Sequence, residues 1–275
     1  MMRLHLDKGL WAIALLATLG FGGTAGATPP ACPTGVVIVL NFSDNQYTAC
    51  FTDVRRGADI NDDGAPDLGG TGHTALNFTG GAGPAGDTWL TKLTPNGATL
   101  ICDAAAGSGL MVLQADVLIH TFNNTKGAGL VALLDSAPGS KGLAVILYDQ
   151  GNSDALQLAT IDPVTGQLTK LTSVSLGAGI AENTWYHLFT TVSTVGLDQL
   201  TVTAGVSRHT TPTDPNSLLD GAVGPTLLFS GSLRALGLDH EGEVGIAASA
   251  FSTNVSSSVT NFLLGASCHS PTLAD

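Results

Sequence analysis

Short hydrophobic segments alternate with short polar turns along most of this 275-residue chain. The segments are rich in Val, Ile, Leu, Thr and Phe, which favour extended strands, and the turns contain Gly, Asn, Asp and Pro. Helical periodicity is nearly absent after the first 27 residues. The pattern predicts strands at 35–42, 72–78, 87–94, 110–122, 127–135, 141–149, 155–162, 166–176, 184–193, 198–206, 243–251 and 258–265. Many short strands joined by polar turns predict an all-β antiparallel sandwich or barrel.

The segment "TWYHLFTTVS" (184–193) shows the strand alternation clearly. Successive side chains of a strand point to opposite faces, so the alternation separates two sets of residues. One face carries Trp185, His187, Phe189 and Thr191, and the other carries Tyr186, Leu188, Thr190 and Val192. Both faces contain apolar groups, as expected for a strand inside a layered fold. We therefore expect Trp185 to be a core anchor, and His120 and His187 to be hydrogen-bonded inside their strands.

The first 27 residues have the layout of a secretory signal peptide. Arg3 and Lys8 precede the apolar run "LWAIALLATLGFG", and the small-residue stretch "TAGATPP" follows it. The run is shorter than the ~20 residues that a membrane-spanning helix needs, which disfavours a permanent anchor. We expect cleavage after Ala27 and no membrane span in the remaining chain. The predicted location is extracellular or the cell surface, and the periplasm remains open.

The charge balance narrows the choice of partners. The chain has 10 Lys and Arg against 22 Asp and Glu, for a net charge of −12. An acidic surface repels phosphate backbones, so nucleic acid is not an expected partner. Residues 28–275 have the length of one all-β domain, and we expect them to form a single unit.

Four cysteines, Cys32, Cys50, Cys102 and Cys268, follow the signal segment. An even number in an exported chain suggests two disulfides, and three pairings are open. Because the two ends of a sandwich often lie side by side, we favour Cys32–Cys268, which leaves Cys50–Cys102. Their spacing matches no common metal site.

The stretch "GADINDDGAPDLGG" (57–70) has the spacing of a cation-binding loop. Oxygen ligands are expected from Asp59, Asn61, Asp63, the carbonyl of Ala65, and Asp67, around a tight turn at Gly64. Alternate oxygens in such a loop can surround one hard cation such as calcium. An EF-hand would place a bidentate Glu at the twelfth position, where this chain has Gly70. The stretch instead resembles the calcium loops of FG-GAP repeats of the integrin α-subunit type. We expect structural calcium in a loop-rich segment, 44–109; the alternative is a solvated acidic turn.

A second resemblance covers residues 110–265. It rests on "GAGLVALL", "KGLAVILYD", "NTWYHLFTTVS…LDQLTVTAGV" and "GEVGIAASAFSTNVSSSVTNFLL", in that order. Together they resemble the concanavalin A-like lectin and glucanase superfamily, in particular its laminin-G-like domains. The resemblance implies a jelly roll of two curved antiparallel sheets, whose concave face or rim loops bind glycans. Residues 28–109 match this family poorly beyond a first strand.

The sequence offers no clear catalytic centre. Asp239, Glu241 and Glu243 alternate in "DHEGE", but Gly242 interrupts them, and we expect a rim rather than the carboxylate pair of a glycosidase. Nucleophile-elbow and zinc-protease motifs are absent from the sequence. The long connection "SRHTTPTDPNSLLDGAVGPT" (207–226) is typical of functional loops. We expect its ligand contacts to come from Arg208, His209, Asp214, Asn216 and Asp220.

These observations predict a secreted, non-catalytic, lectin-like or adhesive module with structural calcium. Its expected partner is a carbohydrate or an extracellular or surface protein. Two other functions stay open at this point: a glycan hydrolase or lyase of the jelly-roll type, and a structural surface or matrix protein that assembles with itself.

Overall fold

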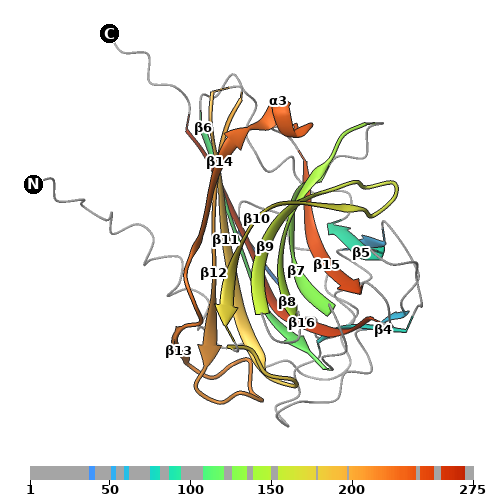
Figure 1. Cartoon of the computed structure of the whole chain (residues 1–275), viewed down its shortest axis with the longest axis vertical. Helices are drawn as coiled ribbons and strands as arrows, with labels where there is room; N and C mark the ends of the chain where they lie inside the picture. The colour runs from blue at the N-terminus through green and yellow to red at the C-terminus, as the bar shows by residue number, and fades with distance from the viewer. Residues whose placement is uncertain are drawn as a thin grey trace, which may run out of the picture.

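The computed structural model describes thirteen ranges of the chain, which contain two antiparallel β-sheets (Figure 1). The described residues are 37–40, 51–53, 59–61, 75–80, 87–93, 108–120, 126–134, 139–149, 154–177, 179–196, 198–239, 242–250 and 255–269. The predicted signal segment (1–27), Cys32, Cys50 and Cys102 lie outside them. Cys268 lies in a described strand, but its side chain does not belong to the described part.

The first sheet, called sheet A, has the order β13-β12-β11-β6-β16-β4-β3, with β1 paired to β16 and β14 paired to β12. Its strands are β1 (Val37–Leu40), β3 (Asp59–Asn61), β4 (Leu76–Gly80), β6 (Ser108–Ile119), β11 (Trp185–Val195), β12 (Gln199–His209), β13 (Leu219–Ala222), β14 (Leu227–Ser232) and β16 (Val255–His269).

The second sheet, sheet B, has the order β10-β9-β8-β7-β15-β5-β2. Its strands are β2 (Phe51–Asp53), β5 (Asp87–Leu93), β7 (Lys126–Leu134), β8 (Gly142–Asp149), β9 (Asp154–Ile161), β10 (Leu168–Gly177) and β15 (Glu243–Ala250). Among the described strands, the chain changes sheet after β1, β2, β4, β5, β6, β10, β14 and β15. The predicted two-sheet antiparallel jelly roll is confirmed, and every predicted strand segment overlaps an observed strand.

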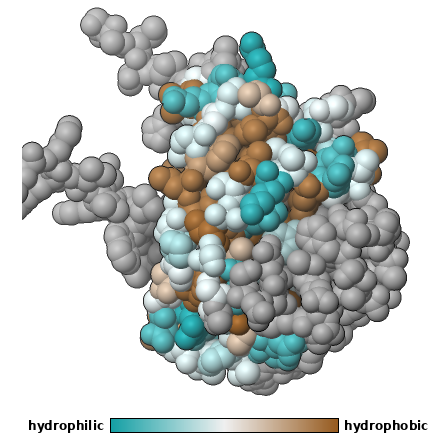
Figure 2. Space-filling model, in the orientation of Figure 1, coloured by the Kyte–Doolittle hydropathy of each residue, from teal (hydrophilic) through white to brown (hydrophobic). Residues whose placement is uncertain are grey.

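The main hydrophobic core lies between the two sheets. Sheet A contributes alternate residues such as Leu113, Val117 and Leu188, and sheet B contributes Val145 and Ile246. A smaller buried cluster, including Ile146 and Tyr148, uses the intervening positions of β8 and so lies on the other face of sheet B. Because both faces of β8 are buried, its sequence is a nearly continuous apolar run. Figure 2 shows hydrophobic residues grouped along the middle of the visible described surface, with polar residues beside them.

The predicted alternation in β11 is also confirmed. Tyr186, Leu188, Thr190 and Val192 are buried toward the core, whereas His187, Phe189 and Thr191 are half-buried on the outer face of sheet A. Trp185 is buried as expected, although it packs with Leu118 and Ala75 in a separate small cluster rather than in the main core.

The structure differs from the sequence prediction mainly between residues 207 and 238. This region, predicted as a loop up to residue 226, contains the end of β12, the exposed strand β13, then β14 and the short helix α3 (Leu233–Leu236) at one end of the molecule (Figure 1). The sequence of strand β13 has no alternating apolar pattern, which is why the strand was not predicted. It is an edge strand, and its conformation depends on pairing with β12. No helix in the described ranges combines the length and apolar character needed to cross a membrane.

Candidate functional site

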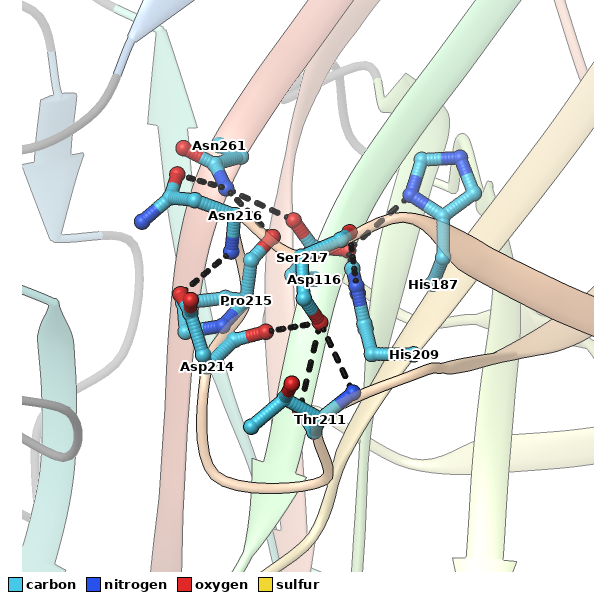
Figure 3. A network of polar contacts seen from close by, with 9 residues as sticks. All are labelled: Asp116, His187, His209, Thr211, Asp214, Pro215, Asn216, Ser217 and Asn261. Carbon is cyan, nitrogen blue, oxygen red and sulfur yellow. Dashed lines mark hydrogen bonds and ion pairs between the residues drawn. The ribbon is translucent and has the colours of Figure 1, made fainter.

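A polar cluster lies on the outer face of sheet A, where a loop covers four adjacent strands (Figure 3). Asp116 of β6 pairs in register with His187 of β11 on one side and with Thr260 of β16 on the other. His209 is the last residue of β12, two positions after Ser207, the register partner of His187. Residues separated by two positions share a face of a strand, so Asp116, His187 and His209 converge.

Asn261 reaches the same cluster through an irregularity in β16. The register shifts between Thr260 and Leu263, and Asn261 has a positive φ of 50°. The left-handed conformation is costly for most residues with a side chain, and Asn is among the few that tolerate it. The irregularity aims the Asn261 amide at Asp116, and β-bulges commonly re-aim side chains in this way.

Asp116 is the centre of the cluster. Its Oδ1 atom accepts hydrogen bonds from His187 Nδ1 at 3.0 Å and from His209 Nε2 at 2.8 Å. Its Oδ2 atom accepts one from Asn261 Nδ2 at 2.7 Å. Only 3% of Asp116 is exposed, so these three donors replace the water that the carboxylate would otherwise bind.

The hydrogen bonds determine the charge of the cluster. Burial alone would raise the pKa of Asp116, but its hydrogen bonds and electrostatic interactions with the His187 and His209 rings outweigh burial, so this pKa lies below its ordinary value. Burial would lower the pKa of His209, but the carboxylate of Asp116 and the carbonyl of Ser217 raise it overall. Both ring nitrogens of His209 face acceptors, since Nδ1 lies 3.0 Å from the Ser217 carbonyl oxygen. The carboxylate of Asp116 and the ring of His209 therefore each favour the charged form of the other in this buried site.

The covering segment, residues 210–218, is held by its own hydrogen bonds and by bonds to the sheet. The Thr210 amide donates to the Leu218 carbonyl, and the Ser217 hydroxyl donates to the carbonyl of Asp214 at 2.8 Å. The carbonyl of Pro212 accepts from the Trp185 amide at 2.8 Å. These bonds hold the loop over the polar cluster.

The predicted ligand-contact residues have different positions in this arrangement. His209, Asp214 and Asn216 all belong to the network, and the Oδ1 atom of Asn216 accepts from Asn261 Nδ2 at 3.3 Å. Arg208 is exposed and points away from the cluster, because it alternates with His209 along β12. Asp220 is exposed in β13, outside the network. Contact of any of them with a ligand stays a prediction.

Sequence reasoning missed Asp116 and gave His187 only an internal structural role. The sequence did contain a signal for a polar site at Asp116, because Asp116 is the one charged residue within the apolar strand 108–119. A carboxylate in such a strand requires partners if it is buried. The partners themselves could not be identified, because they lie far away in the sequence.

An aromatic residue lies beside the polar cluster on the same face of sheet A. Phe189 follows His187 by two positions and pairs in register with Gly205 of β12 and Gln114 of β6. A Cβ atom built on Gly205 would lie 2.5 Å from Cε1 and 2.6 Å from Cζ of the Phe189 ring. The ring therefore leans across β12 and occupies the space that the missing side chain leaves. Phe189 and Gln114 are both half-buried.

The predicted calcium loop is only partly within the described ranges. The backbone of Asp59 and Asn61 lies in β3, which pairs with β4 through Asp59–Thr79 and Asn61–Asn77. Their side chains, together with Asp63, Ala65 and Asp67, lie outside the described residues. Calcium binding there stays a prediction. Of the "DHEGE" carboxylates, Glu243 begins β15, whereas Glu241 is also outside the described ranges.

Comparisons with known proteins locate the chain at the level of the fold. No protein-family model and no curated protein matches it. Among solved structures, a GH43 glycoside hydrolase engineered for endo-xylanase and exo-arabinofuranosidase activity has a TM-score of 0.52 and 12% identity. That match covers 89% of this chain but only 43% of the hydrolase chain. Identity at this level shows a shared fold alone.

Two further solved structures have lower scores. The carbohydrate-binding module CBM66 from Bacillus subtilis has a TM-score of 0.42 and 11% identity, covering 77% of this chain and 92% of the module. Lectin I-B4 from Griffonia simplicifolia, in its metal-free form, has a TM-score of 0.44 and 12% identity. It covers 85% of this chain and 100% of the lectin.

Proposed function

We propose that this protein is a secreted, non-catalytic module that binds carbohydrate on the outer face of sheet A. The observation that carries the proposal is the placement of Phe189, whose half-buried ring leans over Gly205 at the centre of this face. An aromatic ring offers an apolar surface against which the C–H groups of a sugar ring can pack. We name this surface, made of Gln114, His187, Phe189, Thr191, Thr203 and Ser207, the sheet A platform.

The other residues of the platform supply hydrogen-bonding groups around the ring. Gln114 and Thr191 flank Phe189 on β6 and β11, and Thr203 and Ser207 flank Gly205 on β12. All four are half-buried, so their polar groups are held near the surface rather than in the core. Binding sites for small polar ligands commonly combine an apolar surface with a few fixed polar groups.

The covering loop, residues 210–218, forms the border of the platform at one end. Its network fixes Asn216, which is exposed, and Asp214, which is half-buried, beside Asn261 of β16. Groups that are already ordered before binding lose little conformational entropy when a ligand arrives. A preordered border therefore supports recognition of a flexible glycan.

A glycan array with the full chain tests the proposal, followed by calorimetry on the best ligand. We expect Phe189→Ala to weaken binding by roughly tenfold, about 1.4 kcal/mol. The matched control is Val164→Ala, which removes an exposed apolar side chain (76% exposed) from the turn between β9 and β10 of sheet B and should leave affinity unchanged. Equal affinities for wild type and Phe189→Ala would contradict the platform. Absence of glycan binding would contradict the proposed function altogether.

A sugar-release assay on the same glycans tests the non-catalytic part. A glycosidase needs two carboxyl groups about 5–9.5 Å apart across the bond that it cleaves. Within the described part of the cluster, Asp116 has both oxygens occupied by donors, which favours a binding role over an acid–base role. Release of reducing sugar by the purified chain would contradict this proposal and favour the hydrolase alternative.

We further propose that calcium braces the segment 59–67, which begins in β3, on the spacing of its oxygen ligands. The expected result is a rise in melting temperature and slower proteolysis of this segment when calcium is added. Asp63→Asn should abolish both effects. Unchanged melting temperature and unchanged proteolysis after calcium and after chelator would contradict the calcium proposal.

A further inference from the structure

We propose that Asp116, His187 and His209 form a binding site for a divalent transition metal of the zinc class, separate from the predicted calcium loop. Each of the three residues offers one donor atom, and the three atoms lie within 4.8 Å of one another. They come from three adjacent strands, β6, β11 and β12, so the backbone hydrogen bonds of the sheet fix their spacing.

Two of the three distances between donors are close to those of a metal centre, and all three atoms lie within 4.8 Å of one another. His187 Nδ1 and His209 Nε2 lie 3.0 and 2.8 Å from Asp116 Oδ1. With metal–ligand bonds of 2.0–2.1 Å in tetrahedral geometry, neighbouring ligand atoms are about 3.3 Å apart. The two Asp116–histidine distances would widen by a few tenths of an ångström to admit the ion, while the two histidine nitrogens would settle at the same ligand–ligand distance from each other. Hydrogen bonds join these donors, and metal binding would replace the shared protons.

The groups behind the donors also fit a metal site. His209 Nδ1 donates to the Ser217 carbonyl, which leaves Nε2 as the atom directed at Asp116. Asp116 Oδ2 is held by Asn261, so the carboxylate keeps one oxygen directed toward the histidines. Metal-binding histidines and carboxylates are typically oriented by such outer hydrogen bonds.

The donor set determines the class of ion. Two imidazole nitrogens and one carboxylate oxygen suit Zn²⁺, Cu²⁺ or Ni²⁺, whereas calcium prefers six to eight oxygens. The His187 side chain is 19% exposed, so solvent can reach the site and supply a fourth ligand. Three protein ligands and an open position are the pattern of accessible zinc sites rather than of closed structural ones.

Titration of the chelator-treated full chain with Zn²⁺, followed by calorimetry, tests this inference. We expect saturable one-to-one binding that excess Ca²⁺ does not displace. His187→Ala and His187→Gln should each weaken it by more than about tenfold. The matched control is His120→Ala. His120 hydrogen-bonds Ser258 at 2.7 Å and does not belong to the three-residue group, so this variant should bind as the wild type does.

A second measurement does not depend on any variant. Nitrogen chemical shifts of the histidine rings, recorded with and without Zn²⁺, should change at His187 Nδ1 and His209 Nε2. Failure of the wild type to bind Zn²⁺, wild-type affinity in the His187 variants, or shifts confined to other histidines would each overturn the metal site. His187 belongs to both surfaces, so its variants are read here for Zn²⁺ binding alone, whereas the glycan proposal is tested at Phe189; wild-type Zn²⁺ binding and the effect of Phe189→Ala on glycan binding can therefore fail separately.

Discussion

His209 Nε2 lies 2.8 Å from Asp116 Oδ1, although the two residues are separated by 93 positions in the chain. Both side chains are buried, and Nδ1 of the His209 ring also donates to the Ser217 carbonyl at 3.0 Å. This contact connects the end of β12, and therefore the covering loop that follows it, to the middle strands of sheet A. The ion pair thus fixes the border of the sheet A platform.

Removal of the Asp116 charge should destabilise the protein strongly. Asp116→Asn preserves the size of the side chain but leaves the buried His209 without its counter-ion, and a broken buried pair costs about 3–5 kcal/mol. Urea unfolding in the presence of a chelator measures the change. Asp220→Asn, which alters an exposed carboxylate of β13, should change stability by less than about 0.5 kcal/mol. Similar stabilities of the two variants would show that the ion pair contributes little.

Two substitutions of Asn261 separate its side-chain role from its backbone role. Asn261→Ala and Asn261→Gly both remove the 2.7 Å hydrogen bond to the charged Asp116, for a loss of about 1.5–3 kcal/mol. Only alanine is additionally strained at a φ of 50°. We therefore expect the alanine variant to be less stable than the glycine variant by about 1 kcal/mol in urea unfolding. The opposite order would show that Asn261 does not adopt the left-handed conformation.

The space above Gly205 should be essential for the position of the Phe189 ring. A Cβ atom at residue 205 would lie 2.5 Å from the ring, so Gly205→Ala must displace it. We expect weaker glycan binding with a stability loss of about 1–3 kcal/mol, because the aromatic group is moved rather than removed. Thr201→Ala, at a half-buried position farther along the same face of β12, is the control for general effects on this strand. Equal glycan affinity of Gly205→Ala and wild type would contradict the role given to the ring.

The turn between β9 and β10 should lose order in acid. The Asp162 carboxylate accepts hydrogen bonds from the Thr165 and Val164 amides at 2.8 Å, and these bonds hold the pKa of Asp162 below its ordinary value. A lowered pKa in the folded state means that this carboxylate stabilises the turn above the unfolded value of about 3.9. The stabilisation disappears as the pH falls through the lowered pKa.

NMR detects this loss through the amide protons of Val164 and Thr165, which should move upfield together as the pH falls below about 4. In Asp162→Asn these amides should show no such titration. Persistence of the titration in the asparagine variant would assign it to another group.

The strands and their two faces could be predicted from the sequence, because both depend on local properties. Alternation in β11 correctly separated the buried Leu188 from the outward Phe189. The short edge strand β13 was missed, since its residues carry no periodic signal and pairing with β12 determines its conformation. His209, Asp214 and Asn216 were selected from a long polar connection, and the structure places them in one network.

By itself, the sequence determined an antiparallel sandwich, because the two-residue period of apolar positions specifies which side of each strand must be buried. Only the tertiary structure decided that β6, β11, β12 and β16 are neighbours in register, and so brought Asp116, His187, His209 and Asn261 together. The physical reason is that alternation fixes the direction of a side chain but not the identity of the strand beside it. That identity follows from how all the apolar faces pack at once, and the polar cluster is a consequence of this packing.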